Sequence, residues 1–255
     1  MKKTKLSIII CIVMALVLIC ATGCAGGVDK EYEYNTEIIK NSNAPSSGDV
    51  DIKSIEYFTP DFNQNFVELP YTVKDTDIEI IAIGSYTGDY IESELSKDVD
   101  DDLAILVKNN SKQIISYSSI TVDCGNDKVC TFSPTNLPSG QCSLVFPNSD
   151  AVSYADVTKF ECTDSMAVMT DSLAMLDGTV GIDYKNGEFI LTNLTGENLG
   201  DVYIRYRNCT EDNIYLGGIT YSTVQKGVEP FETYKIPVDN FSTENSVIVS
   251  VESIK

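Results

Sequence analysis

The chain has 255 residues, and its composition excludes several kinds of chemistry. It contains no histidine and no tryptophan, and 38 Asp and Glu outnumber 18 Lys and Arg, for a formal net charge of −20. Without imidazole there is no Ser-His-Asp or Cys-His nucleophile and no histidine-based zinc site. An acidic chain without a basic stripe also disfavours nucleic acid as a partner.

Residues 1–23 have the pattern of an export signal. Three lysines precede an apolar run from Leu6 to Cys20, and small residues then lead to Cys24. A basic start, a short apolar run and small residues before a cleavage site are typical of secretory signals. The run is shorter than the roughly 20 residues of a membrane-spanning helix. Plain secretion and an uncleaved signal anchor are the alternatives to a lipid-anchored protein.

The segment Ala21-Thr22-Gly23-Cys24 resembles the lipobox of bacterial lipoproteins, although Ala21 stands where that pattern usually has leucine. The resemblance implies that Cys24 is acylated and becomes the mature N-terminus. It also implies a lipid anchor at the extracellular face of the cell membrane. Stable anchoring needs two membrane signals, and a diacylglyceryl group supplies two chains on one thioether.

The composition of residues 24–50 predicts a flexible tether. They include the polar, turn-forming stretch from Asn41 to Gly48, and ~25 flexible residues span roughly 25–30 Å. Beyond the three signal lysines, 15 Lys and Arg remain against 38 Asp and Glu, a formal net charge of −23. This charge disfavours anionic head groups and wall polymers as partners, unless a divalent cation bridges them. The large apolar residues that follow are expected to dock on the first domain; they are Ile55, Tyr57, Phe58, Phe62, Phe66 and Leu69.

From Tyr71 onward the sequence predicts short strands arranged twice on one plan. Residues 103–111 resemble residues 188–195, since both are apolar strands that end in an Asn-rich turn with a hydroxyl residue. Each is followed by a second strand, over 114–123 in the first half and 199–208 in the second. A Pro-containing turn that leads into a further strand comes later in each half, over 137–146 and 228–237. The final strands are expected over 155–162 and 245–253, and only 164–176 could hold a turn or two of helix.

Three local signals support this plan. Asn186-Gly187 suits the positive φ angles of a type I′ hairpin turn. Val247, Val249 and Val251 alternate with their neighbours, which predicts a strand with one strongly buried face. Gly217-Gly218 lies inside an expected strand and indicates a bulge or a close-packing point.

The predicted fold class is all-β, with two tandem antiparallel immunoglobulin-like β-sandwich domains after the signal peptide and tether. The first domain is expected over 51–163, with an N-terminal extension, and the second over 164–255. Domains of this size bury about 60–65% of their unfolded surface, so we expect the two to lean on each other near 164–179.

The first half resembles the FxLYD domains that are frequent in Gram-positive lipoproteins. The resemblance rests on Val107-Lys-Asn-Asn-Ser111, Ile120-Thr-Val122 and Leu137-Pro-Ser-Gly140, although Thr121-Val-Asp-Cys124 stands where the naming signature would be. It covers roughly 60 residues and implies an Ig-like fold without enzymatic activity. In the second half, Tyr215–Tyr221 is similar to a segment of Clostridia-type surface proteins.

Five cysteines lie beyond Cys24: Cys124, Cys130, Cys142, Cys162 and Cys209. An odd number excludes complete disulfide pairing within one chain. Their positions among apolar strand residues favour buried thiols, with disulfides Cys124–Cys130 or Cys142–Cys162 as the alternative. A catalytic thiol is disfavoured because no histidine is present to activate it.

The acidic run Asp98, Asp100, Asp101 and Asp102 is the candidate metal site. Calcium takes six to eight oxygen ligands, but the EF-hand spacing is absent and adjacent strand residues point to opposite faces. We therefore expect a solvated acidic loop, with a calcium site as the weaker alternative and no other cofactor.

These features predict a non-enzymatic binding or spacer module of the cell surface, with another surface protein or an envelope component as partner. The alternative is an accessory lipoprotein of a transporter or cell-wall-processing complex. Sandwich folds host many functions, so the fold alone does not choose between them.

Overall fold

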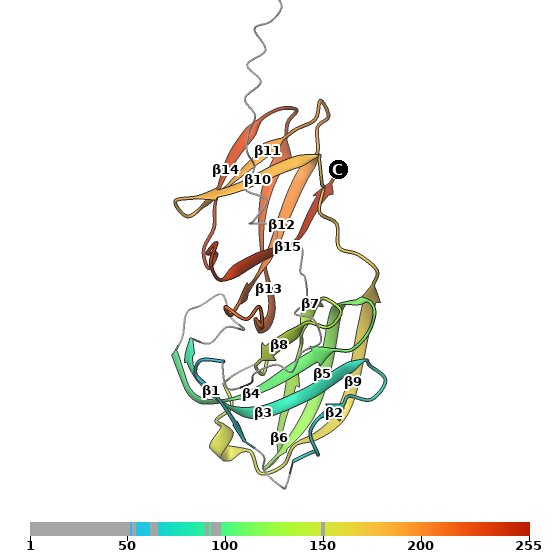
Figure 1. Ribbon diagram of the computed structural model, residues 1–255, viewed down its shortest axis with the longest axis vertical. Coiled ribbons are helices and arrows are strands. Elements are labelled where there is room, and N and C mark those ends of the chain that lie inside the picture. Colours follow the sequence, from blue (N-terminus) through green and yellow to red (C-terminus); the bar gives the residue numbers. More distant parts are fainter. Residues whose placement is uncertain (1–51, 53–54, 62–65, 90–91, 93–97, 149–150) are drawn as a thin grey trace, which may run out of the picture. The chain divides into compact units, whose positions relative to one another are not determined.

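A computed structural model of the chain describes residues 52, 55–61, 66–89, 92, 98–148 and 151–255. Within them the regular structure is almost entirely β, and the 3₁₀ helix η2 spans Tyr154–Asp156. No helix of this part of the chain is long and apolar enough to cross a membrane. The prediction of an all-β sandwich built from antiparallel sheets is confirmed (Figure 1).

The strands divide between two halves of the chain. The N-terminal half contains β1 (Phe58–Asp61), β2 (Tyr71–Thr72), β3 (Ile78–Asp89), β4 (Asp98–Asn109), β5 (Ile114–Gly125), β6 (Lys128–Phe132), β7 (Thr135–Leu137), β8 (Cys142–Val145) and β9 (Glu161–Thr170). The C-terminal half contains β10 (Val180–Lys185), β11 (Glu188–Asn193), β12 (Gly200–Cys209), β13 (Tyr215–Val228), β14 (Thr233–Pro237) and β15 (Ser246–Ile254).

In the N-terminal half two layers enclose one apolar core. One layer has the order β1-β3-β4-β8, with β2 also on β3, and the other has β5 at its centre, between β9 on one side and β6 and β7 on the other. Ile80 and Ile105 face the core from the first layer, and Ile120 and Phe132 face it from the second. All four are fully buried.

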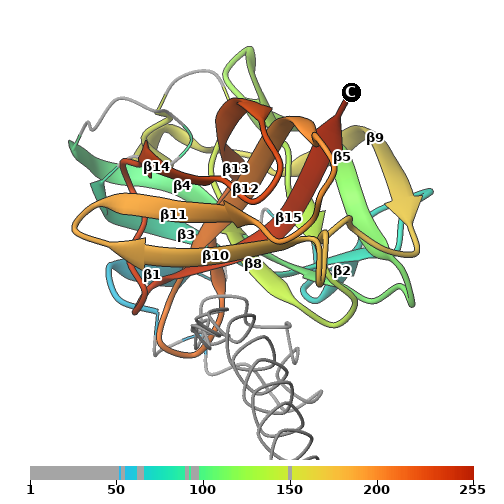
Figure 2. The ribbon, with the colours of Figure 1, turned by 90° about the horizontal axis from the view of Figure 1, so that it is seen from above.

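The C-terminal half repeats this strand order with fewer strands. One layer is β10-β11-β14, and the other is β13-β12-β15; Figures 1 and 2 show β10 and β11 lying side by side. Its core includes Phe189 and Leu191 from one layer and Ile204 and Val251 from the other. The predicted equivalence of the outgoing strands holds, because β8 pairs with β4 as β14 pairs with β11. The closing strand of the first half was expected over 155–162, but it is β9, over 161–170, and residues 154–156 form η2.

A buried asparagine marks the same point in each half. Asn109 donates from Nδ2 to the carbonyls of Gln113 and Leu137, both at 2.8 Å, and its Oδ1 accepts from the backbone and hydroxyl of Ser111. Asn193, 84 positions later, makes the matching four bonds to Glu197, Glu229 and Thr195. This shared motif confirms the internal repeat that the sequence predicts.

The two halves share one sheet. Strand β13 pairs in parallel with β8 through Tyr215↔Ser143 and Leu216↔Leu144, so the layer β1-β3-β4-β8 continues into β13-β12-β15 as one eight-stranded sheet that also includes β2. Val247 and Val249 of β15 belong to the N-terminal core, whereas Ile248 and Val251 belong to the C-terminal core. We expected one strongly buried face on β15; instead residues 246–251 are buried on both faces.

The apolar residues before Tyr71 dock on the N-terminal half, as expected. Ile55 and Phe58 are buried in a third apolar cluster with Leu106, Leu144 and others, while Phe66 and Leu69 pack on the main core. Tyr57 differs, because 62% of its surface is exposed, and Phe62 lies outside the described residues.

Of the three local signals, the hairpin and the glycine pair are confirmed. Asn186 and Gly187 have φ angles of 55° and 79° and join β10 to β11. The register of β12 and β13 shifts beside Gly217-Gly218, and a Cβ on Gly218 would lie 2.4 Å from the Ser133 carbonyl oxygen. The stretch that could have held a helical turn, 164–176, is not helical over residues 164–170, which lie in β9 and pair with β5.

Candidate functional site

Cys24, the expected lipid attachment residue, lies outside the described residues, as do the signal peptide over 1–23 and the tether over 24–50.

The four candidate metal-ligating aspartates lie at the start of β4 but do not converge. Asp98 and Asp100 are exposed, Asp101 is half-buried and Asp102 is buried. Asp100 accepts a hydrogen bond from the Thr87 hydroxyl at 3.1 Å. Asp101 has a φ of 56° and interrupts the regular alternation of the strand.

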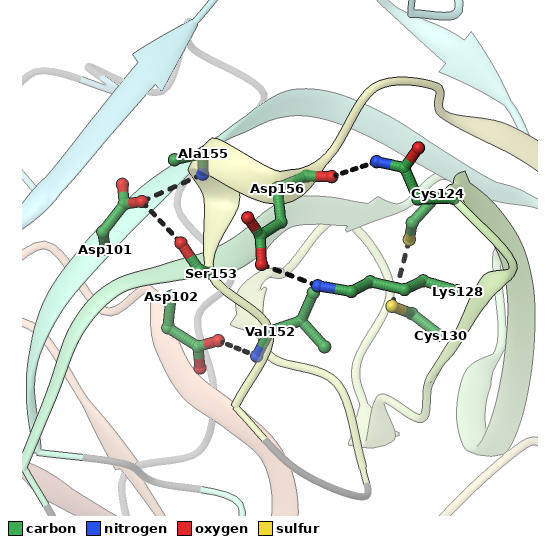
Figure 3. Close-up of polar contacts among 10 residues, drawn as sticks. Asp101, Asp102, Cys124, Lys128, Cys130, Val152, Ser153, Ala155 and Asp156 are labelled. Atoms are coloured by element: carbon green, nitrogen blue, oxygen red, sulfur yellow. Dashed lines mark hydrogen bonds and ion pairs between the residues drawn. The ribbon is translucent and has the colours of Figure 1, made fainter.

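Asp101 and Asp102 hold the segment around η2 against β4 (Figure 3). Asp101 accepts from the Ser153 hydroxyl at 3.0 Å and the Ala155 amide at 2.9 Å, and Asp102 accepts from the Val152 amide at 2.6 Å. Partial burial raises the pKa of Asp101, but these hydrogen bonds outweigh it and lower the pKa overall. No group of three or more metal-ligating side chains occurs within the described ranges. The carboxylates of Asp101 and Asp102 therefore accept hydrogen bonds from the loop around η2.

Arg207, in β12, lies where the halves meet and has no exposed surface. Its two terminal nitrogens donate to the carbonyl oxygens of Thr135 and Gly217 and, at 3.0 Å, to the Ser143 hydroxyl. The guanidinium carbon lies 4.5 Å from the centroid of the Tyr215 ring. Arg207 thus ties β12 to β7, β8 and β13.

Glu92, between β3 and β4 in the chain, approaches the same junction. Its carboxylate accepts from the amides of Phe146, at 3.1 Å, Gly218, and Ile219, at 3.0 Å. Burial raises the pKa of Glu92, while the amides and the charge of Arg207 oppose that shift. Burial lowers the pKa of Arg207 to about 10, against the influence of Tyr215 and Glu92, so Arg207 keeps its charge at neutral pH.

No pattern in the sequence predicted this junction. Arg205 and Arg207 are the two arginines of the sequence, and a planar guanidinium suits buried carbonyl acceptors better than an ammonium group. An arginine in a predicted strand of a chain that otherwise uses lysine was the available signal. Glu92 carries no such signal, because it is one of 38 acidic residues.

The five thiols lie in different surroundings. Cys124, Cys130 and Cys209 belong to the main N-terminal core, Cys142 to the third cluster, and Cys162 is partly buried. The Sγ atoms of Cys124 and Cys130 are 3.0 Å apart. The structure thus brings together one of the two cysteine pairs that the sequence offered.

Apolar side chains are exposed on the outer face of the layer that contains β5 and β9. Tyr117 and Val168 are cross-strand partners, and Met166 lies two residues from Val168 on the same face, opposite Ser119. Their exposed fractions are 43%, 47% and 50%. We call these three residues the β5–β9 patch.

Comparison with known proteins adds no assignment: no family model, curated protein or solved structure matches the chain.

Proposed function

We propose that the protein is a bacterial cell-surface lipoprotein, anchored through Cys24 at the extracellular face of the membrane. Support comes from the order of features in residues 1–24: three lysines, a short apolar run and small residues before the cysteine. A protein held in this way is presented outside the cell without a membrane-spanning segment.

We propose further that its two halves are immunoglobulin-like units that act as a non-enzymatic spacer or binding module. The observation that carries this proposal is the same strand plan occurring twice, joined through the β8–β13 pairing and the Arg207 contacts. A shared sheet resists bending between units better than a linker does, which suits a spacer. The side chains of Asp101, Asp102 and Arg207 form hydrogen bonds with backbone groups.

The β5–β9 patch supports a binding role. An amphipathic tyrosine beside two apolar side chains is typical of protein contact surfaces, and the acidic composition disfavours nucleic acid. The partner is proposed to be a surface protein or another envelope component. An accessory role in a transporter or cell-wall-processing complex is the alternative, and the resemblance to FxLYD domains is compatible with both.

The anchor is tested with Cys24→Ala in the native host. The expected result is loss of the protein from the membrane fraction, with release to the medium or accumulation of the unprocessed precursor. Cys162→Ala serves as the control, because this thiol lies in the described fold and should not affect fractionation. Unchanged membrane association of Cys24→Ala would reject the anchor.

The binding role is tested by cross-linking on intact cells followed by affinity purification of the lipidated protein. Met166→Lys with Val168→Lys should abolish a specific cross-linked species, because two charges replace the apolar contact. Val129→Lys, at an exposed position of β6, is the matched control and should retain it. If both variants retain every species, the β5–β9 patch is not the contact surface.

A further inference from the structure

We propose that Cys124 and Cys130 are a disulfide-forming pair that fastens the β5–β6 hairpin. Their Sγ atoms lie 3.0 Å apart, and a sulfur–sulfur bond is about 2.0 Å long, so bond formation needs a closer approach of about an ångström. Figure 3 shows the two sulfur atoms pointing toward each other from neighbouring strands.

The hairpin places the two cysteines at a fixed separation. Cys130 lies opposite Val122 in the ladder, and Cys124 occupies a register irregularity between Asp123 and Gly125. The turn that follows has three successive positive φ angles, at Gly125, Asn126 and Asp127. The register of the pair is therefore set by the backbone, before any sulfur–sulfur bond exists.

Contacts outside the hairpin hold its end in place. Lys128 forms an ion pair of 2.7 Å with Asp156, and the Asn126 side chain donates to the Asp156 carbonyl at 3.3 Å. Lys159 forms a second ion pair, of 2.9 Å, with Asp123. The hairpin end is thus tied to the segment containing η2, which limits separation of the two sulfur atoms.

The other cysteines are less suited to pairing. Cys142 belongs to the third apolar cluster and Cys162 packs against the main core, so the alternative pairing Cys142–Cys162 joins residues in different surroundings. Cys209 reaches the main N-terminal core from β12 of the other half, but it is Cys130 whose Sγ lies 3.0 Å from that of Cys124. A chain with one disulfide and three thiols resolves the odd number of cysteines.

The chemistry is thiol–disulfide exchange with an external disulfide as the oxidant. The Cys130 thiolate attacks the external disulfide, forms a mixed disulfide and releases one thiolate. The Cys124 sulfur, after losing its proton, attacks Sγ of Cys130 and releases the second thiolate. Two protein thiols lose two electrons and two protons in total, and the oxidant becomes two thiols. The hydrogen bond from Cys124 and the charge of Lys128 favour the Cys130 thiolate, which keeps its pKa below the usual value despite burial.

Cys124 and Cys130 are both buried in the folded protein, with exposed fractions of 0% and 2%. The bond is therefore expected to form while the hairpin folds, before the core closes over it. That timing requires an oxidising environment, and this part of the inference rests on the proposed export of the chain. The ability of the two sulfur atoms to pair does not depend on export.

The test is peptide mapping of two samples of the full chain, alkylated in denaturant without reduction. One sample comes from the membrane fraction, and the other is purified protein refolded in a glutathione redox buffer. Trypsin separates Cys124, in residues 113–128, from Cys130, in residues 129–159. The expected product is the two peptides joined, with two hydrogen atoms less than their summed mass and separable by reductant.

Variants identify the sulfur atoms involved. Cys142 shares a tryptic peptide with Cys130, so Cys142→Ser must retain the cross-link, whereas Cys130→Ser must abolish it. Adding reductant to the oxidised wild type should lower the thermal unfolding midpoint by about 5 °C or more.

The outcomes separate the two proposals. A cross-link in the refolded sample alone supports the pair and contradicts the proposed location. Five alkylated thiols at Cys124, Cys130, Cys142, Cys162 and Cys209 in both samples would overturn the disulfide, leaving a hydrogen-bonded pair of thiols.

Discussion

Asn109 and Asn193 end equivalent strands and bond to the backbone in the same pattern. The sequence predicted a turn at both positions from the recurring asparagine and hydroxyl residues. It could not predict that the asparagines are buried. Each buried side-chain amide needs a carbonyl acceptor that is distant in the chain, Leu137 for Asn109 and Glu229 for Asn193. A local sequence pattern can predict a turn, whereas the burial of a polar side chain depends on hydrogen-bond partners that the tertiary structure supplies.

Asn109→Ala and Asn193→Ala are each expected to lower the free energy of unfolding by about 3 kcal/mol, because each leaves several buried backbone groups without partners. Urea unfolding measures the change. Asn110→Ala is the control: this exposed side chain bonds to Glu79, and its loss should change stability by less than about 0.5 kcal/mol. Equal effects of all three substitutions would contradict the structural role of the motif.

Arg207→Met should destabilise the protein by about 3–5 kcal/mol, because the substitution removes the buried donor to the Thr135 carbonyl and the charge that acts on the buried Glu92 carboxylate. Arg205→Met is the matched control on the same strand. Arg205 forms a partly exposed ion pair of 2.7 Å with Glu252, which contributes about 1 kcal/mol or less. The comparison uses urea unfolding of both variants, and similar losses would show that Arg207 does not hold the junction.

At the scale of single elements, strands with strong alternation or good turn residues could be predicted. Strands β5, β11 and β12 lie close to their expected ranges, and Asn186-Gly187 forms the expected hairpin. Strand β4 begins at Asp98, within the segment that was expected to be a solvated acidic loop. The errors have a tertiary cause. Residues 164–170 show no clean strand alternation, yet pairing with β5 makes them a strand, and the bulge opposite Arg205 lets β15 contribute to two cores.

Gly187→Ala tests the β10–β11 turn. No atom lies within 4 Å of an added Cβ, so the cost comes from the φ of +79° alone and should be about 1–2 kcal/mol. The control is Gly196→Ala, because its added Cβ would make ordinary contact with Phe231 at 3.5 Å. Chemical denaturation should show a change of about 0.5 kcal/mol or less for this control. A Gly187→Ala protein as stable as the wild type would contradict the left-handed turn.

At the scale of the whole molecule, composition and repetition predicted an all-β chain with one plan used twice. They could not predict how the halves join. The sequence favoured contact near 164–179, and Ala174 does accept a hydrogen bond from the Val251 amide at 2.7 Å. The larger connection runs through β8 and β13, a two-residue parallel pairing without a periodic signature, and through Arg207.

The central structural claim is that the two halves form one folded unit through this junction. Differential scanning calorimetry of the soluble chain beginning after Cys24 tests it most directly. If the halves are one unit, the expected result is one transition, with a calorimetric enthalpy equal to the van't Hoff enthalpy. Two separate transitions, with the C-terminal half unchanged when the N-terminal half has already unfolded, would contradict it.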